Sequence, residues 1–292
     1  MPNIRQILSA KTTEIDAWLH AYFAKLGNTN GYPRALLLAA EYSLFSGGKR
    51  IRPALALLVN EAYGAEPARA LPIAAALEMI HTYSCIHDDL PAMDNDDFRR
   101  GRPSCHRQYN EATAILAGDA LLTEAFAALA LVPDREYLPE LVRLLAEAAG
   151  FQGMVAGQTA DIAAEGGEAE LAFIHAHKTG ALLTASVLLP AIIHNPPASD
   201  LASIRKFGES LGLAFQIVDD ILNETADAEI LGKPTGTDRE AGKLTWVTLH
   251  GLDRARQMAK TEIDNAKSAI EFLGTAGASL RLLADYVLLR DR

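Results

Sequence analysis

The chain has 292 residues, and its 49% hydrophobic and 22% charged residues are typical of a globular protein with a large buried core. The formal net charge of −10 argues against nucleic-acid binding, because contacts to phosphates need a basic surface. Two cysteines in so long a chain do not make a disulfide framework, which favours a reducing compartment. The first residues lack the apolar core of a signal peptide, and no stretch reaches the ~18 uninterrupted apolar residues of a membrane span. We therefore expect a cytoplasmic protein with no membrane span and no nucleic-acid partner.

Helical periodicity runs through nearly the whole chain, with Ala and Leu abundant, and it predicts an all-α fold. Pro33 opens one helix that runs to Phe45, and Pro72 begins a long one that runs on through a cluster of aspartates. Further helices are expected at 4–26, 53–63, 110–132, 135–149, 150–164, 168–193, 199–224, 239–249, 252–273 and 276–290. No linker or repeat divides the chain, so we expect a single domain over residues 1–292.

The aspartate cluster lies at the end of an apolar helical run, within His81–Asp97. Its five aspartates are Asp88, Asp89, Asp94, Asp96 and Asp97. So many carboxylates repel one another unless they are spread through solvent or held by cations, and Mg²⁺ prefers such hard oxygen ligands. A solvated acidic loop is the alternative.

A second acidic pair, Asp219 and Asp220, also ends an apolar helical stretch, and Asn223 shares the helix face of Asp219. Two such pairs on apolar helices are hard to explain as surface residues. If the helices face each other, the carboxylates form a cage that would be strongly destabilising without metal.

Basic residues lie where a polyanionic ligand would need them, although lysines and arginines at helix ends are usually solvated. They occur in Gly47-Gly48-Lys49-Arg50-Ile51-Arg52-Pro53 and Arg99-Arg100-Gly101-Arg102-Pro103, and at Lys178, Lys233 and Lys243. The glycines beside Lys49 leave room for a ligand to approach the backbone, and a guanidinium group such as that of Arg52 or Arg100 suits a phosphate.

Taken in order, these segments resemble the trans-isoprenyl diphosphate synthases, most closely the bacterial short-chain farnesyl diphosphate synthases. The matching patterns are GGKRxRP at Gly47–Pro53, ExxHxxSxxHDDxxxxD at Glu78–Asp94, Arg99–Pro103, GQxxD at Gly157–Asp161, the pair Lys178-Thr179, FQxxDDIL at Phe215–Leu222 and KxxGxDxxxGKxT at Lys233–Thr245. The resemblance implies one polyprenyl synthetase domain with the isoprenoid synthase fold, a helical bundle around a central cavity, and a homodimer. It also implies an Mg²⁺-dependent prenyltransferase that condenses isopentenyl diphosphate with dimethylallyl or geranyl diphosphate by ionisation, condensation and elimination.

The resemblance also assigns roles to single residues. Three Mg²⁺ ions would be held by Asp88, Asp89, Asp94, Asp219 and Asp220, and the allylic diphosphate would be reached by Arg99, Lys178 and Lys233. Isopentenyl diphosphate would be held by Lys49, Arg52, His81 and Arg100, and Lys243 would be a further substrate-binding residue. Thr179, Gln216 and the carbonyl group of Lys178 would face the developing allylic cation, and Arg290 and Arg292 would close over the isopentenyl site.

Two features depart from the simplest family pattern. Asp94 follows Asp88 by six residues, and a straight helix would turn it about 120° away, so we expect a bulge at Pro91. Asn223 stands where the family commonly has a third aspartate, which puts a metal-binding role at that position in doubt.

Product length is implied by the residues before Asp88. Tyr83 and Ser84 lie five and four residues before it, about 6 to 7.5 Å along the helix axis. In a plain DDxxD motif the last aspartate lies four residues after the first, so the Asp88–Asp94 spacing contains a two-residue insertion. By resemblance, this insertion together with an aromatic Tyr83 implies the fifteen-carbon product, farnesyl diphosphate. The small Ser84 leaves geranylgeranyl diphosphate as an alternative.

Other classes of protein share parts of the pattern. Glu78–His81 fits the ExxH of a di-iron bundle, but a second ExxH is missing. Without the matching motif, His81 in its apolar helix would be interpreted as a core histidine. A class I terpene cyclase would carry a different second motif. A non-catalytic partner subunit would tend to lose an aspartate motif, and both are substantially present here. His87 is interpreted as a partner of a carboxylate rather than as a metal ligand.

Overall fold

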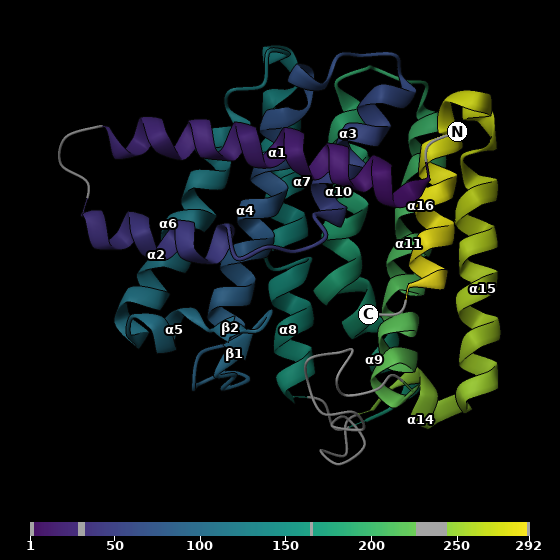
Figure 1. The fold of residues 1–292 in the computed structure, drawn as a ribbon. Helices are drawn as coiled ribbons and strands as arrows, with labels where there is room; N and C mark the ends of the chain where they lie inside the picture. Colours follow the sequence, from purple (N-terminus) through teal and green to yellow (C-terminus); the bar gives the residue numbers. More distant parts are fainter. Residues whose placement is uncertain (1–2, 29–32, 164–165, 226–243, 291–292) are drawn as a thin grey trace. The chain divides into compact units, whose positions relative to one another are not determined.

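The structure, a computed structural model, describes residues 3–28, 33–163, 166–225 and 244–290. The predicted substrate ligands Lys233 and Lys243, and Arg292, lie outside these ranges. Within them the regular secondary structure is helical apart from one antiparallel pair of two-residue strands, which confirms the predicted all-α class (Figure 1).

Contacts divide the chain into two compact units, and each is described by itself. The first comprises Met1–Asn60 and Ala65–Val142, and the second Glu61–Gly64 and Arg143–Arg292. The single domain over residues 1–292 stays a prediction.

The first unit is built around helix α4, which packs against α1, α2 and α6. Its elements are α1 Ile4–Gly27, α2 Arg34–Leu44, most of α3 Ile51–Ala62, η1 Pro67–Arg69, α4 Leu71–Asp88, β1 Phe98–Arg99, β2 Arg102–Pro103, α5 Cys105–Gln108, α6 Glu111–Leu129, η2 Arg135–Tyr137 and the start of α7 Leu138–Ala149. Ile73, Leu77 and Ile80 of α4 are fully buried, because an apolar helix surrounded by other helices buries every face. This buried helix ends at Asp88, the first residue of the aspartate cluster.

The second unit is built around α11, which packs against α10, α15 and α16. Its elements are the rest of α7, α8 Met154–Ala163, α9 Glu168–Ile174, η3 His175–Gly180, α10 Ala181–Ile192, α11 Ala198–Thr225, α14 Trp246–His250, α15 Leu252–Ala269, η4 Glu271–Gly277 and α16 Ala278–Leu289. Ile217 and Val218 of α11 are buried with Trp246 in one core cluster. The second pair of aspartates follows these buried residues directly.

Most predicted helices are present with ends shifted by a few residues, and three differ. The helix beginning near Pro72 ends at Asp88, so the prediction that it continues through the aspartate cluster was wrong. The predicted helix 168–193 consists of α9, the π-helical segment η3 and α10. Of the predicted helix 239–249, the described residues show Trp246–His250.

Two segments have the length and mean hydropathy of a membrane span, α6 and Glu271–Leu289, with 39% and 28% of their most apolar windows buried. By length and composition alone, core helices of globular proteins pass the same test. The second segment is broken at Gly274, whose φ of 53° and ψ of −130° are not helical.

Candidate active site

The first aspartates lie where α4 ends and the chain turns back on itself. Asp88 is the last helical residue, and the Leu90 amide donates to the His87 carbonyl at 3.1 Å. The Asp94 amide then donates to the Asp88 carbonyl at 2.8 Å, so the six-residue spacing closes a loop. The predicted bulge at Pro91 is therefore replaced by a helix end. A proline fits there because no helical hydrogen bond is needed beyond Asp88.

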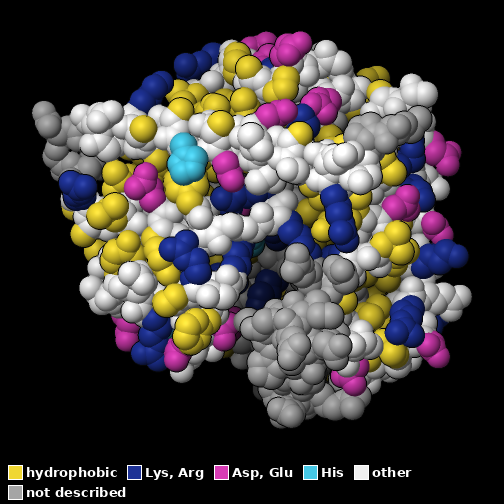
Figure 2. All heavy atoms as spheres, in the orientation of Figure 1, with side chains coloured by type: hydrophobic (Ala, Val, Ile, Leu, Met, Phe, Trp, Pro, Cys, Tyr) yellow, Lys and Arg dark blue, Asp and Glu magenta, His cyan; other side chains and the backbone are white. Residues whose placement is uncertain are grey.

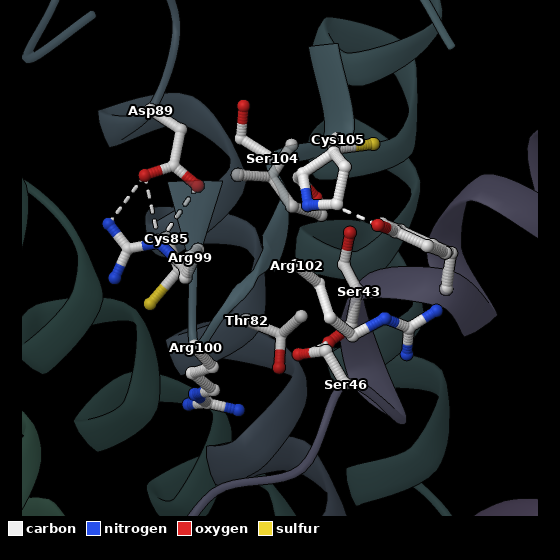
Figure 3. Close-up of a pocket in the computed structure, with 13 residues that line it drawn as sticks. Ser43, Ser46, Thr82, Cys85, Asp89, Arg99, Arg100, Arg102, Ser104 and Cys105 are labelled. Carbon is white, nitrogen blue, oxygen red and sulfur yellow. Dashed lines mark hydrogen bonds and ion pairs between the residues drawn. The ribbon is translucent and has the colours of Figure 1, made fainter. Parts of the chain in front are cut away.

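Asp89 is buried and paired with Arg99 on β1 (Figure 3). Arg99 Nε lies 2.8 Å from both carboxylate oxygens and Nη2 lies 2.6 Å from Oδ1. A buried carboxylate needs such a partner, because desolvation strongly disfavours an isolated charge. The structure therefore joins a predicted metal ligand to a predicted diphosphate ligand.

Arg100, the next residue, packs on the glycine-rich loop. Its Nη1 donates to the Gly47 carbonyl, and a Cβ atom at Gly48 would lie 2.6 Å from the same Nη1. Gly48 also has a φ of +129°, which an L-residue side chain rarely tolerates. The room beside the loop, predicted for a ligand, is occupied here by the Arg100 guanidinium group.

His81 lies on α4 among these guanidinium groups. Burial lowers its pKa well below the usual value, and the charges of Arg52, Arg100 and Arg99 lower it further. Its imidazole is therefore neutral at pH 7. The first unit brings together four of the predicted substrate ligands, and Lys49 lies half-buried two residues before α3.

The predicted chain-length residues lie one turn back on α4. Tyr83 is buried, and burial together with the Asp88 carboxylate raises its pKa to about 12. The Ser84 hydroxyl donates to the His81 carbonyl at 3.0 Å. The Tyr83 ring meets the His87 ring edge-on, with centroids 5.8 Å apart.

His87 contacts α6 rather than Asp88. Its Nε2 lies 3.0 Å from the Ile115 carbonyl and 3.9 Å from an Asp119 oxygen, and its ring fills the space where a side chain at Gly118 would project. The carboxylate beside His87 is therefore that of Asp119.

In the second unit, Lys178 and Thr179 lie on the π-helical segment η3. Single π-turns inserted between α-helices are frequent at functional sites. Lys178 Nζ lies 2.6 Å from Asp161 of α8, a partner that sequence reasoning had not assigned. A Cβ atom at Gly157 would lie 2.6 Å from Lys178 Cα, so the missing side chain lets α8 pack directly on η3.

The aspartates of α11 also have partners. Arg290 Nη2 lies 2.6 Å from Asp219 Oδ1, and its guanidinium group lies over the Phe215 ring at 3.8 Å from the centroid. The buried Asp220 accepts the backbone N–H of Trp246 at 2.8 Å. Gln216, on the same helix, is half-buried. Arg290, which we expected over the isopentenyl site, contacts a predicted metal ligand.

Among the described residues, no three His, Cys, Asp or Glu side chains are grouped closely enough to hold a metal ion. The residues nevertheless fit Mg²⁺, which is commonly bound by one or two carboxylates plus substrate phosphates and water. The closed loop between Asp88 and Asp94 provides carboxylates of this kind.

On the face drawn in Figure 2, Lys and Arg side chains are interspersed with Asp and Glu. Arg52, Arg99 and Arg100 instead lie close enough to His81 to lower its pKa.

Comparisons with known proteins agree with this arrangement. The polyprenyl synthetase profile matches residues 33–271. A farnesyl diphosphate synthase from Geobacillus stearothermophilus is 44% identical over 99% of this chain and 98% of its own. A chloroplastic geranylgeranyl pyrophosphate synthase from Catharanthus roseus is also 44% identical, over 86% of this chain and 72% of its own. The crystal structure of an FPP/GFPP synthase from Zymomonas mobilis, in the apo form, superimposes with a TM-score of 0.85 at 33% identity, covering 98% of each chain. The chain has the isoprenoid synthase fold and belongs to the polyprenyl synthetase family of trans-prenyl diphosphate synthases.

Proposed function

We propose that this prenyltransferase is an Mg²⁺-dependent farnesyl diphosphate synthase. It condenses isopentenyl diphosphate with dimethylallyl diphosphate and then with geranyl diphosphate. The observation that carries the proposal is the buried Tyr83, one turn before Asp88 on α4. Sequence identity does not decide the product, because farnesyl and geranylgeranyl synthases match equally well at 44%.

Ionisation of the allylic substrate requires neutralisation of its diphosphate. Mg²⁺ would be held by Asp88, Asp89, Asp94, Asp219 and Asp220, and the metal would supply positive charge to the leaving group. Arg99 and Lys178 would add their own charge once they exchange the carboxylates of Asp89 and Asp161 for phosphate oxygens. Lys233, expected beside them, lies outside the described residues.

Condensation requires the second substrate to be held in position. Lys49, Arg52 and Arg100 would bind the isopentenyl diphosphate, and the neutral imidazole of His81 would donate one hydrogen bond to it. The double bond of this substrate attacks the allylic cation. A proton then leaves the new carbon chain, with the released diphosphate as its acceptor. The Thr179 hydroxyl, the Gln216 amide oxygen and the Lys178 carbonyl would face the cation.

Product length would be limited by Tyr83. Its ring is buried and lies against the His87 ring, which is itself packed on Gly118 of α6. An aromatic group supported in this way cannot easily rotate aside for a longer chain. Geranylgeranyl diphosphate synthesis is the alternative, favoured by the small Ser84 beside it.

We infer a homodimer in the cytoplasm. Helix α6 exposes the apolar side chains Ile115 and Leu116, which are 44% and 57% accessible, and such residues often lie in subunit interfaces. Both cysteines carry unpaired thiols, in keeping with a reducing compartment. A role as a non-catalytic partner subunit is less favoured, because both aspartate motifs are substantially present.

The experiment measures prenyl diphosphate formed from isopentenyl diphosphate and each allylic primer, with and without Mg²⁺. Activity should require Mg²⁺, and Asp88→Asn and Asp219→Asn should each lower kcat by at least about a hundredfold. Asp97→Asn is the matched control, because Asp97 pairs with Arg107 at the surface and should keep wild-type activity. Absence of any prenyl diphosphate, or equal effects of all three variants, would refute the proposal.

A further inference from the structure

Two residues of the matching sequence patterns have no role in the proposed reaction, Arg50 in the glycine-rich segment and Glu78 on α4. The structure pairs them. Arg50 Nη1 donates to Glu78 Oε1 at 2.7 Å, and only 1% and 2% of the two side chains are exposed. Arg50 also donates through Nε to Asp16 at 3.0 Å and through Nη2 to the Leu44 carbonyl at 2.6 Å. One buried guanidinium group therefore joins α1, the end of α2 and α4.

The backbone at Arg50 is unusual as well. Its φ is +48°, in the left-handed region that non-glycine residues seldom adopt, and Gly47 and Gly48 also have positive φ. Its carbonyl accepts the Ala54 amide at 2.9 Å and so begins helix α3. A strained residue of this kind persists only where surrounding contacts hold it. The three hydrogen bonds of the Arg50 side chain are contacts of this kind.

The residues next to this anchor are predicted ligands of isopentenyl diphosphate. Lys49 precedes Arg50 directly, and Arg52 lies two residues after it, in the first turn of α3. At the other end of the ion pair, Glu78 lies three residues before His81, on the same side of α4. The pair therefore sets the spacing between the loop that carries two predicted ligands and the helix that carries a third.

Stability alone is a weak explanation for a buried ion pair such as Arg50–Glu78. A buried ion pair is often no more stabilising than apolar residues of the same volume, because desolvating both charges is costly. Burial opposes the charge of Arg50, but Glu78 and Asp16 outweigh burial and raise its pKa, so the guanidinium group stays protonated. An apolar pair could not make the directional hydrogen bonds by which Arg50 fixes the glycine-rich segment against α4.

We propose that Arg50 is a positioning residue, paired with Glu78, that holds Lys49, Arg52 and His81 in the geometry that binds isopentenyl diphosphate. The inference rests on the proposed function, because the three ligands are those of the second substrate. A purely structural role would lower stability and affect both substrates alike. A positioning role affects one substrate selectively.

The test uses the full-length protein and the variants Arg50→Gln, Arg50→Lys and Glu78→Gln. A displacement of about 1 Å at a binding group weakens its action roughly tenfold to a hundredfold. We therefore expect Arg50→Gln and Glu78→Gln to raise KM for isopentenyl diphosphate about tenfold or more, with KM for geranyl diphosphate changed less than about twofold. Arg50→Lys should restore part of the loss, because lysine keeps the charge but not the planar fork.

Arg69→Gln is the matched control in the same unit. Arg69 pairs with Asp134 through Nε at 2.9 Å and Nη2 at 2.6 Å, away from the predicted ligands. This variant should lose thermal stability and keep both KM values. Circular dichroism and the melting temperature show whether each variant is folded, and Glu78→Gln, which keeps the volume of the side chain, covers the case in which Arg50→Gln does not fold.

Calorimetric titration with isopentenyl diphosphate separates this inference from the proposed function. If the wild-type protein binds isopentenyl diphosphate but forms no product, the proposed reaction fails, while about tenfold weaker binding by folded Glu78→Gln still supports the positioning role. Equal changes in both KM values, or changes in melting temperature alone, would overturn the positioning role. A wild-type protein that does not bind isopentenyl diphosphate would overturn both.

Discussion

Arg290 Nη2 lies 2.6 Å from Asp219 Oδ1 and 2.7 Å from the Phe215 carbonyl, so a buried guanidinium group neutralises a carboxylate that the proposed reaction assigns to Mg²⁺. The side chain of Arg290 is 5% exposed and that of Asp219 is 43% exposed. Metal binding at Asp219 would replace this internal cation, because a carboxylate oxygen engaged in a strong ion pair is a poorer metal ligand.

Arg290→Gln tests this exchange. The metal-free variant should be less stable than the wild type by about 1 to 3 kcal/mol, because hydrogen bonds to a charged group are lost. Mg²⁺ with inorganic pyrophosphate should narrow this difference in stability, since the bound Mg²⁺ supplies the missing positive charge. Thermal unfolding with and without these ligands measures both values.

Lys267→Gln is the control for that experiment. Lys267 of α15 pairs with Asp285 at 2.8 Å. Asp285 lies on α16, the helix that directly precedes Arg290. The effect of Lys267→Gln on melting temperature should not depend on Mg²⁺ and pyrophosphate. If the stability difference between Arg290→Gln and the wild type is the same with and without Mg²⁺ and pyrophosphate, Asp219 does not exchange its partner.

Gly157→Ala should separate α8 from η3. The added methyl group would lie 2.6 Å from Lys178 Cα, too close for either backbone to stay in place. Overpacking of this kind costs about 1 to 3 kcal/mol of unfolding free energy. Because Lys178 shifts as well, KM for the allylic substrate should rise. Thr159→Ala, at an exposed position on the same helix, should change neither quantity.

The stability of the protein should depend on His81 at mildly acidic pH. Its pKa is lowered in the folded state, first by burial and then by Arg52, Arg100 and Arg99. The unfolded chain, with a histidine pKa of about 6.5, therefore binds a proton that the folded protein refuses, and the free energy of unfolding falls as pH drops below that value. For one proton the slope is at most about 1.4 kcal/mol per pH unit. His81→Gln should remove this contribution, so denaturant melts at several pH values should show a shallower decline; parallel declines would contradict it.

The helices and the order of motifs could be predicted from the sequence because both depend on local patterns. Apolar spacing and proline positions located α4 and α11, and the aspartates at their ends were recognised as candidate metal ligands. The end of α4 at Asp88 was missed, because the closure between the Asp94 amide and the Asp88 carbonyl spans a loop whose conformation no periodicity reports. The π-turn at Lys178 was also missed, because the composition of His175–Gly180 is that of an ordinary helix.

The charge partners could not be predicted, because they join residues far apart in the chain. The Arg50–Glu78 pair spans 28 residues and the Arg290–Asp219 pair spans 71. Both carboxylates could be noticed in the sequence, but only the packing of the helices decides which cation reaches each one.

Tyr83→Ala should lengthen the product. Removing a buried ring opens space one turn below Asp88, and the neighbouring residues fill such a cavity only in part. Geranylgeranyl diphosphate should then appear beside farnesyl diphosphate. Tyr83→Phe keeps the ring and should keep the wild-type product; if both variants give the wild-type product, Tyr83 does not limit chain length.

The most direct measurement is the mass of the product that the wild-type protein makes from dimethylallyl diphosphate and excess isopentenyl diphosphate with Mg²⁺, read by liquid chromatography and mass spectrometry. A parallel reaction with a chelator should yield no prenyl diphosphate. Farnesyl diphosphate as the main product is the expected result. Geranylgeranyl diphosphate as the main product, or no condensation at all, would contradict the assignment of this chain as a farnesyl diphosphate synthase.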